Sequence, residues 1–569
     1  MNKLKIIPIA LVMMLSIAGC SIEEEIQDVL DNKPSAITSK TINLTMMQPE
    51  TINPITNKNK SVSYIMNLIY DGLFTIDENY NTVPQLVDQY KISDDGMSIH
   101  IKLKDAKWHD GTPLTSYDVK FTVDLISKSI DSPYYALVEN ISSVLINSSN
   151  EFTINFKYKY AFSLDTLIFP IISEKQLADK KDIDDYRYNL VGNGAYKIKE
   201  YNERKSISLI VNDSYYDKIS QNAKNIDVEI VPDEEAQVSM VISLDSDIAK
   251  ISLDDLSKFY AKEFKTTTYE SRNYECLLFN YNNEFFKDTN FRKAIISSID
   301  KNKILEEGYI NNATLVNFPL NSKSKYYDKD IKCIEYSAEK AKEYLSKVTF
   351  DNKENNNQDV KKNDINTKNN SNKDIETIKN TEEDKKNEIK KQISKLNLKI
   401  IVNKNNSERI KSAYIINDNL KEIGIKSTIE ELSDVDMAKS MSEGNYDIAL
   451  VGWELSSIPD ATNILNNIGY EDEKLTNYIN SLKNATSESQ IKDIYKSIQR
   501  YVNNNALFMS LVKTDDYIAS NRRIEGRISP NSFNIYEGIT NLNISKKQQK
   551  ALNIIECFLF KNSWLGYII

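Results

Sequence analysis

Alternating apolar and polar residues predict several β-strands along the chain. The run TINLTMMQ (41–48) has the two-residue period of a strand, and so has SIHIKLKD (98–105), in which His100 belongs to the outward-facing side. Two further runs, 196–201 and 206–211, are joined by a polar turn and predict a pair of strands. Regular structure is therefore expected from about residue 41 onwards.

The stretch WHDGTPLTSYDV contains one of the two histidines of the chain, next to an aspartate, which resembles an acid–base pair. Local rules account for its polar residues. Asp110 and the glycine after it suit a turn, and Thr115 with Asp118 three residues later forms a capping box before a helix of about three turns. His109 is then the side chain just before the turn, and we interpret the stretch as structural rather than catalytic.

Helical periodicity predicts two longer helices. Residues 291–305 have apolar side chains at helical spacing, at Phe291, Ala294, Ile295 and Ile299. The second helix, at 407–423, ends before Gly424 as its C-cap. Its predicted apolar face consists of Ile410, Tyr414, Leu420 and Ile423.

The order of elements after residue 396 favours an α/β fold. A predicted strand at 396–402 precedes the second helix, and the nearly continuous apolar run YDIALVGWEL (446–455) predicts another, buried strand. Strand, helix, glycine and strand in this order predict a crossover unit with parallel strands.

Two segments depart from this pattern. Residues 351–395 contain 11 Lys, 10 Asp or Glu, 11 Asn and no aromatic residue. They bury too little apolar surface to offset the entropy of ordering, so we expect a disordered excursion, helical at most around 381–395. The end, residues 544–569, is unusually apolar, and the sequence leaves open a final amphipathic helix, a membrane-contacting element or an altered reading frame.

The N-terminus has the features of a bacterial lipoprotein signal. Two lysines precede an apolar run at 6–17 that is too short to span a membrane, and two small residues stand before Cys20. We expect residues 1–20 to be the signal peptide and Cys20 to be lipidated by acyl chains such as palmitate. The polar residues 21–40 would tether the protein to the membrane surface. An ordinary secretory signal with an incidental Cys20 is the alternative.

Composition and missing motifs argue against several classes of function. The net charge is −10, so the chain lacks the excess of cations that a nucleic-acid partner requires. With two histidines and no GxSxG, HExxH, phosphate-binding or dinucleotide-binding motif, we expect no enzyme, no metal and no cofactor. Cys276 and Cys333 have no zinc spacing and are expected to be unpaired, although export would permit a disulfide between them.

A series of motifs stands in a fixed order along the chain. It consists of the aromatic-Asp-Gly-Leu and Trp-His-Asp-Gly-Thr-Pro-Leu-Thr runs within 70–126, VGNGAYKIKEY, the Arg-x-Ala and Ile-Asp helix within 277–305, and GNYDIALVGWEL. This series resembles family 5 extracellular solute-binding proteins, the oligopeptide- and dipeptide-binding components of ABC importers. Asn193 and Ala195 replace the Thr and Pro of the family's Gly-Thr-Gly-Pro-Tyr segment.

The resemblance, from about residue 41 to 543 outside the charged insert, implies the fold. It is an α/β, type II periplasmic-binding-protein fold of two lobes with a ligand cleft between them, the first lobe carrying an extra α/β subdomain. The chain is expected to cross between the lobes twice. The expected ranges are 41–60, 186–268 and 501–543 for the main part of lobe I, 61–185 for its extra subdomain and 269–500 for lobe II.

The resemblance also implies the function. An extended oligopeptide would be bound in the cleft, largely through its main chain, as the lobes close around it. The loaded, monomeric protein would dock on the ABC permease subunits in the membrane. It would lie outside the cytoplasm, attached to the outer face of the bacterial cell membrane by lipid on Cys20.

The resemblance places candidate ligand-binding residues around GWELSS. Similar peptide-binding members often have, shortly after the Gly-Trp, an Asp that pairs with the amino terminus of the ligand, and Ser456 occupies that position here. Glu454 or Asp460 is the candidate substitute for its charge. The full set of candidates is Met46, Met47, Gln48, Gly452, Trp453, Glu454, Ser456 and Asp460, with core packing as an alternative for Trp453 and the two methionines.

Two alternatives to a peptide-binding importer subunit stay open at this point. The same fold could bind a nickel chelate, an oligosaccharide or a signalling peptide. In a different class, the chain could be a surface lipoprotein for sensing or adhesion, with the insert and the tail as its working parts.

Overall fold

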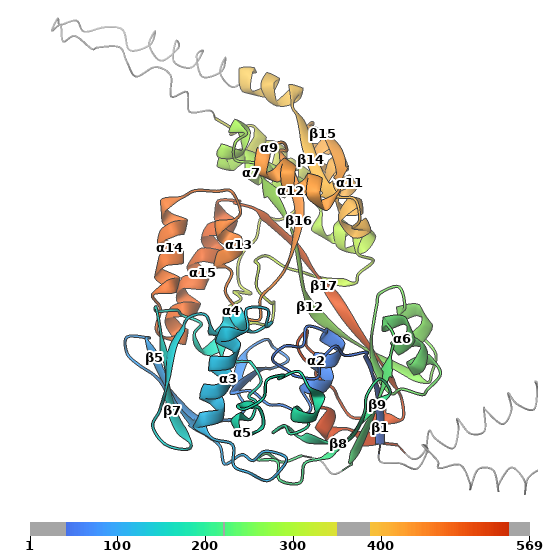
Figure 1. Cartoon of the computed structure of the whole chain (residues 1–569). Coiled ribbons are helices and arrows are strands. Elements are labelled where there is room, and N and C mark those ends of the chain that lie inside the picture. The colour runs from blue at the N-terminus through green and yellow to red at the C-terminus, as the bar shows by residue number, and fades with distance from the viewer. Residues whose placement is uncertain (1–40, 220–221, 350–386, 546–569) are drawn as a thin grey trace, which may run out of the picture.

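The computed structural model describes residues 41–219, 222–349 and 387–545 (Figure 1). The expectations for the signal peptide, Cys20 and the tether lie outside these residues, as do those for most of the insert and for the tail from residue 546. At the end of the insert, residues 387–395 are helical, where the sequence allowed a helix.

One large sheet of eleven strands runs through the molecule. Its order is β15-β14-β16-β12-β17-β11-β1-β10-β9-β8, with β13 pairing beside β17. The strands are β1 (Thr41–Met47), β8 (Tyr196–Asn202), β9 (Ser206–Val211), β10 (Asn225–Val231), β11 (Ile248–Ile251), β12 (Phe264–Phe279), β13 (Ala313–Leu315), β14 (Asn397–Asn403), β15 (Lys426–Leu432), β16 (Ile448–Glu454) and β17 (Met509–Asn521).

Two long antiparallel strands, β12 and β17, join the two halves of this sheet (Figure 1). We call lobe I the half built on β1 and β8 to β11, and lobe II the half built on β14 to β16. The pairing of β12 with β17 shifts register between Glu270 and Tyr274, close to the level where the lobes meet. The predicted two-lobed α/β fold is confirmed, and β12 and β17 belong to both lobes. The residue limits proposed for each lobe stay predictions.

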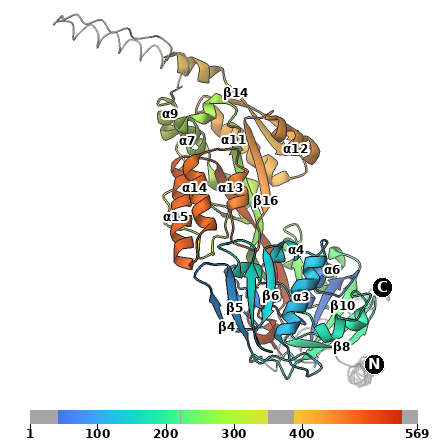
Figure 2. The ribbon, with the colours of Figure 1, turned by 60° about the vertical axis from the view of Figure 1, so that its left-hand side comes forward.

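Lobe I carries a second sheet of four strands in the order β4-β5-β7-β6, with helix α3 packed beside it (Figure 2). Outside the large sheet, the strands and helices of lobe I are β2 (Phe74–Ile76), β3 (Thr82–Pro84), β4 (Val87–Ile92), β5 (Ser98–Leu103), β6 (Ile141–Ile146), β7 (Glu151–Phe156), α2 (Lys60–Met66), α3 (Ser116–Lys128), α4 (Tyr135–Val138), α5 (Glu174–Leu177) and α6 (Glu234–Ile242), and later in the chain β18 (Ile524–Glu525) and β19 (Asn543–Ile544).

Lobe II has apolar cores on both faces of its part of the sheet, because β14 and β16 alternate their side chains between two clusters of buried residues. This explains the nearly continuous apolar sequence of β16. The helices that contribute to these cores are α7 (Thr289–Ser298), a π turn (Ile304–Gly308), α9 (Ala338–Leu345), α11 (Ser407–Glu422), α12 (Asp434–Glu443), α13 (Thr462–Asn466), α14 (Glu473–Lys483) and α15 (Glu488–Asn504). The short α8 (Lys301–Lys303) lies between α7 and the π turn and buries no side chain.

Most of the elements predicted from periodicity are confirmed. β5 buries Ile99, Ile101 and Leu103 and leaves His100 exposed. At the start of α3, the backbone N–H of Thr115 donates to the Asp118 carboxylate at 2.8 Å, as the capping box requires. β14 pairs in parallel with both β15 and β16, so the crossover unit is also confirmed; the sequence pattern missed β15 and α12, which lie between its two strands along the chain.

Two helix predictions need correction. The helix predicted over 291–305 ends at Ser298, because the Asp300 carboxylate accepts from the N–H groups of Asn302 and Lys303 and begins a second helix. In α11, Tyr414 is 52 % exposed rather than buried. The other predicted positions are confirmed, because Leu420 and Ile423 are buried and Ile410 packs against the same core. Ala413 and Ile416 complete the buried stripe.

Candidate functional site

A polar cavity of about 310 Å³ lies where the lobes meet. Strands β12 and β17 contribute Arg272 and Lys513, and lobe I contributes Tyr80. Lobe II supplies the remaining wall from residues 319–324, from the end of β16, from the loop after it and from the start of α13. These residues are Pro319, Leu320, Asn321, Ser324, Trp453, Glu454, Leu455, Ser456, Ser457, Ile458, Pro459, Asp460, Asn463 and Ile464.

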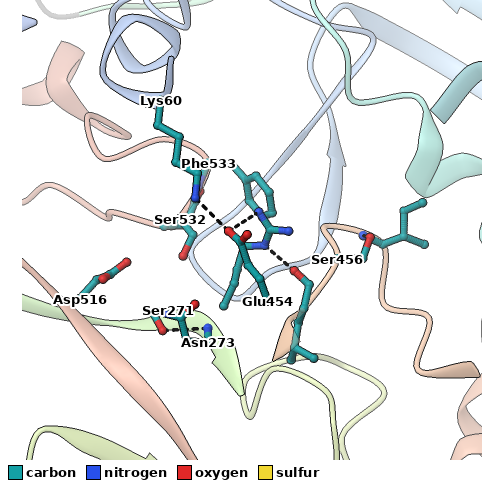
Figure 3. Close-up of polar contacts among 12 residues, drawn as sticks. Lys60, Ser271, Asn273, Glu454, Ser456, Asp516, Ser532 and Phe533 are labelled. Carbon is teal, nitrogen blue, oxygen red and sulfur yellow. Dashed lines mark hydrogen bonds and ion pairs between the residues drawn. The ribbon is translucent and has the colours of Figure 1, made fainter. Parts of the chain in front are cut away.

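Glu454, at the end of β16, is the carboxylate with the most charged surroundings in this cavity (Figure 3). Its Oε1 lies 2.9 Å from Nζ of Lys60, on α2 of lobe I, and 3.2 Å from Nη1 of Arg272. Partial burial alone would raise the pKa of Glu454, but the hydrogen bond from Lys60 and the charge of Arg272 outweigh it and hold this pKa below its ordinary value. The side chain is therefore an anion that binds an ammonium group across the cleft.

Arg272 is fixed in its position by three kinds of contact. Its Nε donates to the carbonyl oxygen of Leu455, its Nη1 pairs with Glu454, and its guanidinium stacks at 4.7 Å over the ring of Phe533. Burial lowers the pKa of Arg272, against the charge of Glu454, which raises it. An arginine nevertheless stays charged at physiological pH, so the cavity keeps a fixed cation beside Glu454.

A buried ion pair closes the cavity on the side of the shared strands. Nζ of Lys513 on β17 lies 2.9 Å from the carboxylate of Glu270 on β12, and both side chains are less than 5 % exposed. The same carboxylate accepts from the N–H and the hydroxyl of Ser322 at 3.1 and 2.6 Å. Each charge is thus paired and hydrogen-bonded, which is the condition for burying it at acceptable cost.

The other candidates at the end of β16 and in the loop after it line the same cavity, but they differ in how many contacts their side chains already make. Trp453 stacks on Tyr274, with ring centroids 6.5 Å apart. Ser456 is exposed and accepts from the N–H of Ile458. Asp460 accepts from the hydroxyl of Tyr160 at 2.8 Å and from the N–H of Thr462 at 2.9 Å, one bond to each oxygen. Asp460 therefore already has local structural partners on both oxygens.

The structure separates the four remaining candidates from this cavity. Met46 is fully buried in the core, so it offers no surface to a ligand. A Cβ on Gly452 would lie 2.6 Å from the Glu275 carboxylate, so this glycine serves the packing of the Glu275–Arg409 ion pair. Gln48 lines two other hollows of lobe I. The remaining candidate, Met47, lines a larger cavity described next.

This larger cavity, of about 570 Å³, lies on lobe I and shares Lys60 with the surroundings of Glu454. Its wall is rich in carboxylates, at Glu234, Glu235, Asp255, Asp515 and Asp516. Burial, together with the charges of Glu270 and Asp516, raises the pKa of Asp515 to about 6. Lys250 pairs with Asp516 at 3.1 Å and Lys258 with Asp255 at 2.7 Å, which leaves carboxylates in excess.

Sequence reasoning missed Lys60, Arg272, Lys513 and Glu270. No local motif contains them, since Lys60 and Glu454 are 394 positions apart in the chain. Only Trp453, Glu454, Ser456 and Asp460 of the eight candidates are brought together at the smaller cavity.

His109 has a structural position in lobe I. Its Nδ1 accepts from the N–H of Gly192 at 3.1 Å, and its Nε2 lies 3.1 Å from the carbonyl oxygen of Gly194. Since Nδ1 is an acceptor, the proton of the neutral ring is on Nε2 and is donated to Gly194. His109 thus clamps the loop that carries the two glycines.

Within the described ranges, no group of three or more His, Cys, Asp or Glu side chains is arranged to hold a metal ion. Cys276 is buried, Cys333 is half-buried, and both are free thiols. Within residues 41–219, 222–349 and 387–545, no helix has the length and apolarity needed to cross a membrane.

Two lobes joined by two shared strands, with a charged cavity between them, define a solute-binding protein of the type II fold. The chain belongs to the bacterial extracellular solute-binding proteins, family 5, whose middle-region model matches residues 81–475.

Comparison with known proteins agrees with this assignment. The chain is 24 % identical over 504 residues to the oligopeptide-binding protein AppA of Bacillus subtilis, covering 84 % of this chain and 87 % of AppA. Among solved structures, it is similar to the ABC transporter substrate-binding protein CtaP of Listeria monocytogenes, with a TM-score of 0.68, 20 % identity and coverage of 89 % and 99 %. It is also similar to NikZ of Campylobacter jejuni in complex with Ni(L-His), with a TM-score of 0.57, 23 % identity and coverage of 89 % and 100 %. At these identities the two structures show the fold.

Proposed function

We propose that the protein is the peptide-binding subunit of an ABC importer. It captures oligopeptides in the cleft between its lobes and delivers them to a membrane permease, and it catalyses no reaction itself. The observation that carries the proposal is Glu454, a carboxylate at the interlobe cavity that already binds an ammonium group at 2.9 Å. The amino terminus of a peptide is chemically the same group.

The surroundings of Glu454 support a peptide more than a simple cation. Trp453 gives the cavity an apolar wall, and Arg272 places a cation next to the carboxylate. The AppA relative is named as an oligopeptide-binding protein. We further propose that the protein acts as a monomer outside the cytoplasm, attached to the membrane by lipid on Cys20.

Mass spectrometry of whatever is released from the gently denatured protein tests the ligand class directly. A ladder of unrelated short peptides is the expected result. A single metal chelate, the kind of ligand that the NikZ structure holds, would replace the peptide proposal, as would a single oligosaccharide.

Replacing Glu454 by Gln should weaken the binding of a peptide with a free amino terminus by up to about fivefold, since an ion pair at a half-exposed site is lost. Isothermal titration calorimetry with the free peptide and with its Nα-acetylated form measures this effect. The acetylated peptide should bind both proteins equally. Asp460→Asn is the matched control, because its carboxylate is already engaged by Tyr160 and Thr462. Equal binding of the free peptide by wild type and Glu454→Gln would contradict amine recognition at Glu454.

A further inference from the structure

Glu454 holds two cations that differ sharply in how firmly they are fixed. Arg272 is only 21 % exposed and is tied to Leu455 and Phe533 as well. Lys60 is 68 % exposed, and within the described part of the chain its ammonium has Glu454 as its sole ion-pair partner. The lysine can therefore leave at little cost, whereas the arginine cannot.

A ligand ammonium at Glu454 would bring a third positive charge to a group with one negative charge. Lys60 and Arg272 both lie within 3.2 Å of Oε1. A third cation within hydrogen-bond reach of the carboxylate would be repelled by both of these charges. Exchange of the less firmly held cation removes this repulsion, and the cation that leaves is Lys60.

A second group of carboxylates lines the same cavity as Lys60 and can accept its ammonium group. Lys60 lines the 570 Å³ cavity of lobe I, where Glu234, Glu235 and Asp515 have no lysine partner within ion-pair distance among the described residues. Because Lys60 lines the same cavity as these carboxylates, its long, flexible side chain has acceptors to turn towards when it leaves Glu454. The charge of Lys60 then stays compensated when a ligand takes its place.

We propose that Lys60 is a specificity-determining residue that acts as a built-in competitor for the amino terminus of the ligand. Its ammonium occupies the amine position on Glu454 in the empty protein, and a peptide binds there by exchanging its own ammonium for that of Lys60. This inference rests on the proposed peptide-binding function. Its consequence is that Lys60 reduces the affinity for peptides with a free amino terminus and leaves the affinity for blocked peptides unchanged.

The expected effect follows from the strength of the pair. A half-exposed ion pair contributes at most about 1 kcal/mol, which corresponds to about a fivefold change in affinity. Lys60→Met should therefore raise the affinity for a free peptide about three- to fivefold and should not change that for the acetylated peptide. The gain should shrink at about 0.5 M salt, because exposed charges are then screened.

Calorimetric titration of one peptide in its free and Nα-acetylated forms, against wild type and Lys60→Met, tests this. Lys58→Met is the matched control, since Lys58 is 64 % exposed, lies two positions away and faces Asp131 instead of Glu454. The expected result is a three- to fivefold higher ratio of free to acetylated affinity in Lys60→Met only. An unchanged ratio, or weaker binding of the free peptide, overturns the inference while the proposed function stands. If neither form binds the folded wild-type protein, the proposed function fails and the inference with it.

Discussion

Replacing Arg292 by Met should lower the free energy of unfolding by about 4 kcal/mol, the largest effect that we expect of a single substitution here. Arg292 on α7 is fully buried, and it donates to four carbonyl oxygens, those of Phe286, Lys287, Asn505 and Ala506, at 2.6 to 3.2 Å. Methionine fills a similar space but leaves these acceptors without donors in an interior that water does not reach.

The pattern of contacts explains why an arginine is needed at this position. No carboxylate of the described residues lies within ion-pair distance of Arg292; the charge is met by carbonyl dipoles and by the faces of Tyr281 and Tyr470, 5.4 and 5.5 Å away. The planar fork of a guanidinium lets one side chain reach both the turn before α7 and the residues just after α15.

Urea denaturation followed by circular dichroism measures the effect of Arg292→Met. Lys293→Met is the matched control: it lies at the next position of α7, is half-buried, and should change the free energy of unfolding by less than about 0.5 kcal/mol. A loss below 1 kcal/mol in Arg292→Met would mean that the four carbonyls find other donors.

Interactions between residues close together in the sequence made much of the fold predictable. The alternation in β5 and the capping box of α3 involve residues within a few positions of one another, so the sequence alone contains the information. The crossover of β14 and β16 followed from the order of elements, because nearly all such connections have one topology.

Long-range contacts set the limit of that prediction. Phe162, from the segment after β7, is 1 % exposed and packs against Tyr326 and Tyr495 of lobe II. Nothing near Phe162 in the sequence indicates that a side chain of lobe I belongs to the core of the other lobe. The same holds for Lys60 and Glu454, whose pairing depends on how the lobes meet.

The motifs that resemble the family turn out to hold the fold together. A Cβ on Gly192 would lie 2.0 Å from the carbonyl oxygen of Ile69, and one on Gly194 would lie 2.7 Å from the carbonyl carbon of Ile69, so the backbones approach too closely for any other residue. His109 binds this same loop, and Arg292 joins α7 to the end of α15. The residues that look catalytic in the sequence are therefore structural, and the candidate site lies where the chain departs from the family pattern.

His109 should make the stability of the protein fall between pH 6.5 and pH 4. Burial lowers the pKa of His109 to about 4, against the hydrogen bond to Gly194 and the charge of Asp110, which raise it; Lys197 lowers it further. In the unfolded chain the ring titrates near 6.5, so in this window the unfolded state binds more protons than the folded state. Stability then rises with pH, and the contribution of the neutral ring is lost as the pH falls. The full shift of the His109 pKa, from 6.5 to about 4, corresponds to about 3 kcal/mol of the free energy of unfolding.

The hydrogen bond between Gly192 and His109 also predicts that stability falls as the pH is lowered. A protonated Nδ1 would place its own N–H against the N–H of Gly192, so protonation breaks the bond that the ring now accepts. Urea denaturation at pH 7 and at pH 4.5 measures the loss in the wild type and in His109→Asn, which has no titrating ring at this position and should lose about 2 to 3 kcal/mol less between the two pH values. His100→Asn is the matched control, because it removes the exposed histidine of β5 and keeps the contact between His109 and Gly192; the smaller loss expected of His109→Asn should not appear in it. If His109→Asn and the wild type lose the same stability, the ring is charged in the folded protein and the N–H of Gly192 has an acceptor other than Nδ1 of His109.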